Sequence, residues 1–346
     1  MKAINQLLFF ILLMTAATEN TLASKQFPSS AQKNKAVLIT GASSGIGRNM
    51  TETLASQGYL VYAGARKDQD MQSLNQIPNV IAVRLDVTVQ SDIDKAVEMI
   101  EEAGLGLFGL VNNAGVALFE PLIEIEEKDL AFQMDVNVFG PYRVTKAFAP
   151  LIMESRGRII NIGSVAGLAT GAMFGPYSMS KFSIEAFSEA LASEMRKFEV
   201  GVSVIEPGNY NSKVMSNLEK RQAQIDEKSK HSLYQAEYQR MAKFTQPDRS
   251  RYKDPDDVSN AVTVILESAK PNLRYMVVPS EQEATYPIKK TISKLVELNY
   301  SQAFRFSRKQ IIQWLDQELT SQTIKSGTSQ TSKVTVTDRA PQAVAE

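Results

Sequence analysis

Short apolar runs rich in β-branched residues alternate with longer amphipathic segments along most of this chain, and this alternation constrains the fold more than any other feature. Apolar runs without polar alternation predict strands that are buried on both faces, as in parallel sheets covered by helices. Single helices between successive strands imply right-handed crossovers. The pattern therefore predicts an α/β fold, a doubly wound parallel sheet of the Rossmann type with about seven strands in a single domain.

The expected elements follow each other in regular order until the sixth strand. The expected strands cover residues 36–40, 59–64, 80–85, 107–111, 158–162, 200–205 and 274–278. The expected helices cover residues 45–57, 89–103, 126–153, 177–198 and 254–269. A polar insertion at residues 209–247 then interrupts the alternation at the sheet edge where ligands bind in such folds. We expect this insertion to be helical and to form a lid over a substrate site.

The two ends of the chain differ from the middle. Residues 1–23 combine a positive start, a short apolar core and a small-residue site, which is the pattern of a secretory signal. An uncleaved anchor is the alternative, although the apolar run is shorter than the roughly 20 residues that span a membrane. The protein is therefore expected in the periplasm or the endoplasmic reticulum, or held by an anchor that faces the cytosol. Residues 320–346 predict a disordered tail, which leaves residues 33–319 for the folded domain.

Composition limits the chemistry that this chain can perform. It has no cysteine and a single histidine, His231, so thiolate sites and histidine-rich zinc sites are excluded and no metal site is expected. Its 38 basic and 38 acidic residues balance, which gives no support for nucleic-acid binding. Acid–base chemistry is left to Tyr, Lys, Ser, Asp and Glu.

A tyrosine placed four residues before a lysine is the main catalytic candidate. The two side chains share a helix face, and a nearby ammonium favours the phenolate, so the pKa of such a tyrosine is expected to fall. The alternative is a rim tyrosine beside a solvated cation. The pattern occurs at Tyr142/Lys146, Tyr177/Lys181 and Tyr286/Lys290. The spacing alone therefore does not select among the three pairs.

A glycine-rich loop follows the first expected strand and opens the first expected helix. Glycines permit a tight turn there, and the free amides of a helix N-terminus attract anions such as a pyrophosphate. The loop candidates for cofactor binding are Gly41, Ser43, Ser44, Gly45, Ile46 and Gly47. The spacing is Gly-x-x-x-Gly-x-Gly, which differs from the common dinucleotide fingerprint.

The same loop permits a rival interpretation. Gly41 to Gly45 matches the Gly-x-Ser-x-Gly elbow of serine hydrolases, with Ser43 as nucleophile and His231 as its base. Its place on the first strand and the polar surroundings of His231 argue against this interpretation.

An ordered series of motifs resembles the short-chain dehydrogenase/reductase family over roughly residues 35–208. After the glycine loop come Asp86, the run Asn112 to Gly115, Asn137, Ser164, Tyr177 with Lys181, and Pro207-Gly208. The family serine precedes the catalytic tyrosine by 13 residues, and Ser164 holds that position relative to Tyr177. At the same offset Tyr142 has Asp129 and Tyr286 has Leu273. The resemblance therefore selects Tyr177 and Lys181.

The resemblance also implies a role for each catalytic residue. Tyr177 is the general acid in reduction and the base in oxidation. Lys181 lowers the pKa of Tyr177 and binds the nicotinamide ribose. Ser164 orients the substrate oxygen and stabilises charge on it. Asn137 takes part in a water relay to Lys181, although an ordinary helix-interior asparagine is the alternative.

The remaining positions of the resemblance line a nicotinamide cofactor. Besides the glycine loop, Tyr177 and Lys181, the cofactor-binding candidates are Arg66, Asp86, Val87, Asn113, Ala114, Gly115, Pro207, Gly208, Tyr210 and Ser212. Ser212 departs from the family pattern, which has a threonine there. Arg66 follows the second expected strand where NAD enzymes carry an acidic residue, so the cofactor is expected to be NADP.

The sequence thus predicts an NADP(H)-dependent oxidoreductase that interconverts an alcohol and a carbonyl. Segments 62–66 and 206–210 resemble the retinol and hydroxysteroid dehydrogenase branch, which implies a small lipophilic substrate. The resemblance also implies a homo-oligomer, and the N-terminus suggests membrane association. A catalytically silent nucleotide sensor or scaffold on the same fold is the alternative from a different functional class.

Overall fold

The computed structural model describes residues 36–212, 222–244 and 252–327 of the chain. The predicted signal or anchor segment at residues 1–23 and the last part of the predicted tail lie outside these residues. The same is true of parts of the insertion, at residues 213–221 and 245–251.

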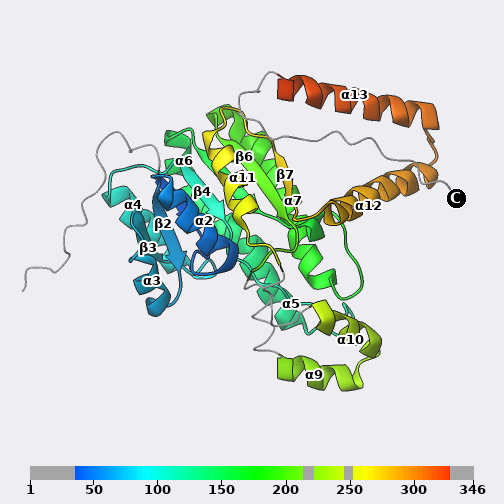
Figure 1. The fold of residues 1–346 in the computed structure, drawn as a ribbon, viewed down its shortest axis with the longest axis horizontal. Helices are drawn as coiled ribbons and strands as arrows, with labels where there is room; N and C mark the ends of the chain where they lie inside the picture. Colours follow the sequence, from blue (N-terminus) through cyan, green and yellow to red (C-terminus); the bar gives the residue numbers. More distant parts are fainter. Residues whose placement is uncertain (1–35, 213–221, 245–251, 328–346) are drawn as a thin grey trace, which may run out of the picture. The chain divides into compact units, whose positions relative to one another are not determined.

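A seven-stranded parallel sheet forms the centre of the fold, with the strand order β3-β2-β1-β4-β5-β6-β7 (Figure 1). Its order reverses beside β1, which is the switch point of doubly wound sheets. The strands are β1 (Ala36–Ile39), β2 (Leu60–Ala65), β3 (Val80–Arg84), β4 (Gly109–Asn112), β5 (Arg158–Ile162), β6 (Gly201–Pro207) and β7 (Arg274–Val277). The predicted fold class is confirmed, and the strands agree with the expected ones to within a few residues.

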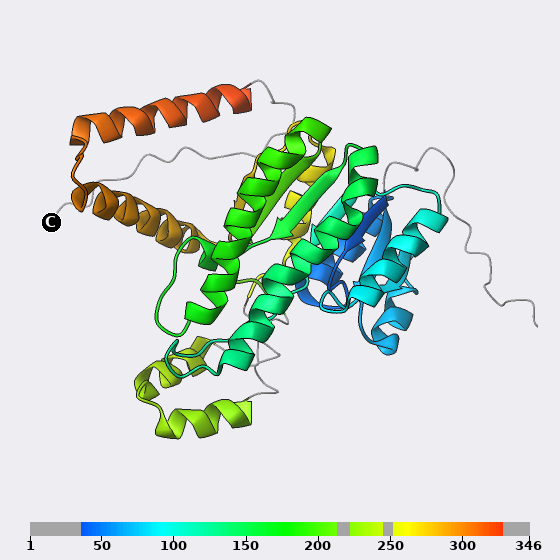
Figure 2. The same cartoon turned by 180° about the vertical axis from the view of Figure 1, so that it is seen from behind.

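Helices cover both faces of the sheet and bury its apolar runs in two cores. One face packs on α2 (Gly45–Ser56) and α11 (Asp256–Glu267), as Figure 1 shows. The other face, turned forward in Figure 2, packs on α4 (Gln90–Glu102), α6 (Gly140–Glu154) and α7 (Gly175–Met195). The short α3 (Asp68–Leu74), which the sequence did not predict, lies after β2. Burial on both faces explains why the strands read as continuous apolar runs.

The helix expected over residues 126–153 consists of three parts. α5 (Glu127–Met134) passes into a π-helical turn, η2 (Asp135–Phe139), and then into α6. Pro141 lies in the first turn of α6 and has no backbone N–H, so the carbonyl four residues before it, that of Asn137, lacks its usual helical donor. Gly140 permits close packing at the same point, because a Cβ there would lie 2.7 Å from Val87 Cγ2. The π turn carries Asn137, in keeping with the frequent occurrence of such turns at functional sites.

The described part of the insertion is helical, as the sequence predicts. It forms α9 (Gln222–His231) and α10 (Gln235–Phe244), which lie beyond α5 in both views (Figures 1 and 2).

Two helices that the sequence did not predict follow β7. They are α12 (Glu281–Tyr300) and α13 (Arg308–Gly327), and α13 continues past residue 320, where the predicted tail begins. The chain divides into two compact units at Ile288/Lys289, so the predicted boundary of the domain at residue 319 differs from this division. Within the second unit, the Phe306 and Trp314 rings make an edge contact at 4.7 Å. None of the helices in the described residues is long and apolar enough to cross a membrane.

Candidate active site

The glycine loop connects β1 to α2 and packs on the segment that follows β4. Gly41 and Gly45 adopt positive φ angles of 64° and 54°, which side chains disfavour. A Cβ at Gly47 would lie 2.3 Å from the Gly41 carbonyl oxygen and 2.5 Å from Asn113 Nδ2. The first-turn amides of α2 have no acceptor within the helix. The loop therefore forms a small, amide-lined cradle that fits a dinucleotide pyrophosphate.

Thr40 and Asn113 hold this cradle in place. Asn113 Nδ2 donates to the backbone oxygens of Thr40 at 2.9 Å and Gly41 at 3.2 Å. Thr40 Oγ1 accepts from the backbone amides of Asn113 and Ala114, both at 3.0 Å. The two loops are thus joined at the carboxyl ends of neighbouring strands. Gly115 follows, and a Cβ there would lie 3.4 Å from Asn137 Oδ1.

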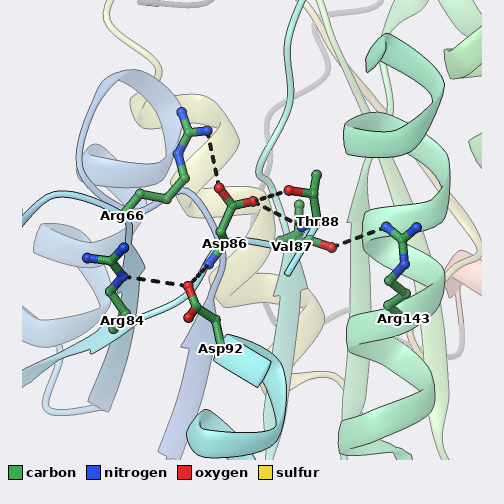
Figure 3. A network of polar contacts seen from close by, with 7 residues as sticks. All are labelled: Arg66, Arg84, Asp86, Val87, Thr88, Asp92 and Arg143. Atoms are coloured by element: carbon green, nitrogen blue, oxygen red, sulfur yellow. Dashed lines mark hydrogen bonds and ion pairs between the residues drawn. The ribbon is translucent and has the colours of Figure 1, made fainter. Parts of the chain in front are cut away.

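Asp86 and Arg66 form a charged pair beside the same sheet edge (Figure 3). Asp86 Oδ1 accepts from Thr88 N at 3.0 Å and Thr88 Oγ1 at 2.7 Å, and Arg66 Nη1 approaches Asp86 Oδ2 at 3.5 Å. Burial opposes ionisation, but the hydrogen bonds from Thr88 and the charge of Arg66 outweigh it and hold the pKa of Asp86 below its ordinary value. The Arg66 side chain is 62% exposed, so its guanidinium remains accessible to a second anion.

Val87 continues this network toward α6. Its backbone oxygen accepts from Arg143 Nη1 at 3.5 Å, as Figure 3 shows, and its side chain is buried in the core. The backbone N–H of Asp86 donates to Asp92 Oδ2 at 3.2 Å. Asp86 is thereby held from both directions along the chain.

Ser164, Tyr177 and Lys181 come together at the end of β5. Ser164 caps the 3-10 turn η3 (Val165–Gly167) by accepting from Ala166 N at 3.1 Å, and its side chain also hydrogen-bonds to Tyr177. Tyr177 and Lys181 lie one turn apart near the start of α7. Lys181 Nζ donates to the Ile162 backbone oxygen at 2.8 Å. The serine, tyrosine and lysine side chains therefore lie together in this structure.

The pKa shift predicted for Tyr177 was wrong in direction. Burial raises the pKa of Tyr177 to about 12, and the hydrogen bond from Ser164 only partly counteracts this effect. The Lys181 ammonium lies 5.6 Å from the centre of the tyrosine ring and is bound to the Ile162 carbonyl. Burial also lowers the pKa of Lys181 to about 8, while Glu185 opposes this change. Tyr177 is thus protonated at neutral pH in this site.

Asn137 is buried, and its side-chain bonds hold the loop after β4. Its Oδ1 accepts from Val116 N at 2.8 Å, and its Nδ2 donates to Val116 O at 2.8 Å and Ser180 Oγ at 3.0 Å. Ser180 Oγ in turn donates to the Tyr177 backbone oxygen at 2.7 Å. Asn137 therefore connects the π turn to the helix that carries Tyr177.

The segment after β6 closes the cofactor side. Gly208 is tightly packed, since a Cβ there would lie 2.5 Å from Glu283 Oε2, which accepts from Asn209 N at 2.7 Å. The Tyr210 side chain is buried in the core and donates to Asp257 Oδ2 at 3.0 Å. Any contact of Tyr210 with a cofactor is thereby limited to its backbone. Ser212 is half-buried and is the last described residue before the gap at 213–221.

Aromatic and sulfur-bearing side chains form the other side of the site. A buried cluster brings residues after β4 and before α7 together with residues of α10, and the Tyr177 ring packs against it. Phe119 is central, with its ring centre 4.8 Å from that of Phe174 and 5.5 Å from that of Tyr177. The members are Ala117, Phe119, Met173, Tyr238 and Met241, with Phe174, Tyr177 and Tyr234 packed against them. We call this set the aromatic cluster.

Polar contacts attach the insertion to the loop after β4. Lys228 Nζ pairs with Glu120 Oε2 at 2.9 Å, and Ser232 Oγ donates to Glu124 Oε2 at 2.6 Å. The insertion is thus attached to the segment that also carries Phe119 of the aromatic cluster. Leu118, which precedes Phe119 in the chain, is buried, and its backbone N–H donates to Gln133 Oε1 at 2.5 Å.

The other two tyrosine–lysine pairs have exposed tyrosines. Tyr142 lies on α6 with Lys146 Nζ 6.0 Å from its ring centre, and Tyr286 lies on α12. Neither has a serine at the required offset, so their surroundings match the rim interpretation.

Several residues that shape the site were not predicted as site residues. They are Thr40, Gln133, Ser180, Glu185, Glu283 and Arg274. Thr40 stands inside the glycine motif and could have been included on that ground. The others make contacts across the fold that leave no local signal in the sequence.

The hydrolase interpretation gains no support from the geometry. His231 is 82% exposed at the end of α9, with Glu227 as its ion-pair partner at 3.9 Å. Ser43 lies in the packed cradle described above.

Comparisons with known proteins find relatives over most of this chain. Residues 35–223 match the family model described as short chain dehydrogenase. The mitochondrial D-beta-hydroxybutyrate dehydrogenase of Mus musculus is 34% identical over 289 residues, covering 78% of this chain and 83% of that protein. The 3-ketodihydrosphingosine reductase of Bacteroides thetaiotaomicron is 32% identical over 248 residues, covering 71% and 88%.

Solved structures share the same architecture. A short-chain dehydrogenase from Streptomyces avermitilis has a TM-score of 0.65 at 27% identity, covering 77% of this chain and 95% of that one. The closed form of serine dehydrogenase complexed with NADP+ has a TM-score of 0.59 at 28% identity, covering 70% and 94%.

Proposed function

This chain belongs to the short-chain dehydrogenase family and is an oxidoreductase that interconverts alcohol and carbonyl groups with a nicotinamide cofactor; we propose that it uses NADP(H), acts on a lipophilic substrate and transfers the proton through Tyr177. The observation that carries the proposal is the hydrogen-bonded Ser164–Tyr177 pair beside buried Lys181, at the same sheet edge as the glycine cradle.

Tyr177 is the proton donor when a carbonyl is reduced. Because burial raises the pKa of Tyr177 to about 12, the phenol keeps its proton at neutral pH and presents it to the substrate oxygen. The Ser164 hydroxyl donates to the same oxygen and stabilises the charge that develops there. Loss of the proton from Tyr177 leaves a phenolate beside the Lys181 ammonium, which favours the transfer.

The cofactor supplies the hydride when it is bound. The glycine cradle, from Gly41 to Gly47, would hold the pyrophosphate, and Asp86, Val87 and Asn113 to Gly115 would line the adenosine side. Arg66 would pair with a ribose 2′-phosphate, because its side chain is 62% exposed and its ion pair among the described residues is with Asp86. Pro207 to Ser212 would close over the nicotinamide.

The aromatic cluster supports a lipophilic substrate. It meets the Tyr177 ring with apolar side chains from the insertion, so a substrate carbonyl held at Tyr177 would extend along aromatic and thioether groups. One similar protein is named for a long-chain lipid ketone, 3-ketodihydrosphingosine, and another for the small acid D-beta-hydroxybutyrate. The apolar character of the cluster favours the first kind of substrate.

Assembly and location form part of the same proposal. Exposed aromatic and sulfur-bearing residues gather on α5, the π turn, α6 and α7, which supports a homo-oligomer that pairs these helices. They are Phe132, Phe139, Tyr142, Met179 and Phe182. Residues 1–23 would direct the protein for export or anchor it to a membrane.

A single kinetic experiment tests the proposed function. Purified protein is mixed with NADPH or NADH and a series of aliphatic, sterol and retinoid carbonyls, and oxidation of the cofactor is followed by absorbance. We expect turnover with NADPH and a kcat/KM that falls by ~10²- to 10⁴-fold in Tyr177→Phe. No turnover of any carbonyl by the wild-type protein, with cofactor binding intact, would instead support the silent sensor, and equal turnover by Tyr177→Phe would contradict proton transfer through Tyr177.

A further inference from the structure

Two buried glutamates and a partly exposed arginine form a charged group near the catalytic lysine. Glu185 follows Lys181 by one turn of α7, Glu206 lies near the end of β6, and Arg274 begins β7. Arg274 Nε donates to Glu185 Oε2 at 3.2 Å and lies 3.8 Å from Glu206 Oε1. Its Nη2 donates to the exposed Glu189 at 2.5 Å.

Glu185 is placed directly beneath the segment that carries Ser164. A Cβ at Gly163 would lie 3.1 Å from Glu185 Oε1, and one at Gly167 would lie 3.3 Å from Glu185 Cγ and 2.9 Å from the Lys181 backbone oxygen. The two glycines thus make room for the glutamate on the inner side of the catalytic helix. Its position relative to Lys181 is that of an i, i+4 pair on one helix face.

Burial of this carboxylate has a cost that its hydrogen bonds do not fully offset. Glu185 Oε1 is buried and makes no hydrogen bond within the described residues. An unsatisfied buried carboxylate oxygen is unfavourable, and an amide or apolar residue would pack here at less cost. A negative charge at this position is therefore expected to serve the site rather than the stability of the fold.

We infer that Glu185 is a positioning residue, whose carboxylate is held by Arg274 and keeps the buried Lys181 side chain charged and bound to the Ile162 carbonyl. The inference rests on the proposed function, since it assigns Glu185 a role through Lys181. Burial favours the neutral amine and lowers the pKa of Lys181 to about 8. The charge of Glu185 opposes this effect, so the pKa would be lower without it.

The other ionisable groups around Glu185 do not replace it. Burial and the charge of Glu185 raise the pKa of Glu206 to about 8, so Glu206 is largely neutral at pH 7. Burial also raises the pKa of Glu185, but the charge of Arg274 and its hydrogen bond oppose that rise. Glu189 is 57% exposed and contacts Arg274 from the solvent side. Tyr177, on the same helix, is protonated at this pH. Among the described carboxylates near Lys181, Glu185 is consequently the one that is both buried and hydrogen-bonded to Arg274.

The test is the pH dependence of kcat/KM for carbonyl reduction, which reports groups of the free enzyme. The wild-type value is expected to fall above pH ~8 as Lys181 loses its proton. Glu185→Gln keeps the shape and removes the charge, and the fall should begin roughly one pH unit lower. Glu189→Gln is the matched control, because it also contacts Arg274, and its profile should follow that of the wild type.

Three outcomes are informative. An acid shift in Glu185→Gln, repeated in Arg274→Met and absent in Glu189→Gln, supports the inference. A Glu185→Gln enzyme with lower thermal stability but an unshifted profile would show a purely structural role and overturn it. Wild-type turnover that does not depend on Tyr177 would overturn the proposed function itself, which the Tyr177→Phe enzyme reveals separately.

Discussion

The two sides of the site are built from different parts of the chain. On the cofactor side, backbone amides, glycines and short polar side chains are joined by hydrogen bonds within the sheet edge, as at Thr40 and Asn113. On the substrate side, large side chains such as Phe119 and Met241 come from a loop and from an inserted helix. Ion pairs such as Lys228 with Glu120 attach the insertion to the loop.

This difference separates what the fold requires from what can vary. The cradle allows almost no added atoms, because its loops are in contact through their backbones. The aromatic cluster can be enlarged or reduced by exchanging side chains without changing the sheet. Changes on the cofactor side should therefore impair every reaction, whereas changes on the substrate side should depend on the substrate.

The largest effect is expected for Gly47→Ala. Its Cβ would lie 2.3 Å from the Gly41 carbonyl oxygen, so the loop must shift, and a displacement of about 1 Å can reduce a rate by 10²-fold. We expect kcat/KM to fall at least ~100-fold for every substrate, with weaker NADPH binding measured by fluorescence titration. Gly171→Ala is the control, because a Cβ there meets no atom within 4 Å. Similar losses in both variants would contradict the packed cradle.

A smaller and cofactor-selective effect is expected for Arg66→Ala. A hydrogen-bonded pair with a charged group contributes about 1.5–3 kcal/mol, so KM for NADPH should rise by roughly 10- to 100-fold. KM for NADH should change little, since NAD has no 2′-phosphate. Arg84→Ala is the matched control, because Arg84 belongs to the same network and pairs with Asp92 at 3.6 Å (Figure 3). A wild-type preference for NADH would contradict the proposed use of NADP.

The cofactor side was also the more predictable side from the sequence. The glycine spacing, Asn113 and the serine offset are local patterns, and each one lies at the end of a strand whose apolar run is readable. The place of Thr40 in the cradle follows from the same motif. Parallel pairing then brings these ends to one edge, which the strand register confirms.

Properties that depend on burial or on distant contacts could not be predicted. The spacing of Tyr177 and Lys181 indicates a shared helix face, but it does not reveal that both groups are desolvated, and desolvation reversed the expected pKa shift of Tyr177. The π turn around Asn137 lies just before Pro141 in a segment that otherwise has helical periodicity, so periodicity alone does not reveal it. The aromatic cluster brings Tyr238 together with Phe119, and these two residues lie far apart in the sequence.

On the substrate side, Met241→Ala should weaken the binding of long substrates selectively. Met241 is buried in the aromatic cluster, and removing its thioether takes apolar contact away from the substrate side of Tyr177. A loss of about 1–2 kcal/mol corresponds to a KM roughly 10-fold higher for long-chain carbonyls, with short ones little changed. Leu233→Ala is the control, since Leu233 lies in the same insertion and is 84% exposed. Equal effects on short and long substrates would show that the insertion does not contact the substrate.

The smallest effect is expected for loss of the ion pair that attaches the insertion to the loop after β4. Lys228→Met removes the ion pair with Glu120, a pair that is partly exposed and therefore of modest strength. We expect KM for long substrates to rise by about 2- to 5-fold at low salt, and the wild-type and variant values to converge at high salt as the pair is screened. Lys230→Met provides the control, because within the described part of the chain the ion pair of Lys230 is with Glu227 of its own helix. The KM for NADPH should be the same in Lys228→Met and wild type at every salt concentration, because the cofactor binds at the backbone-lined cradle. A matching change in the KM for NADPH would show that the two sides of the site are coupled rather than separate.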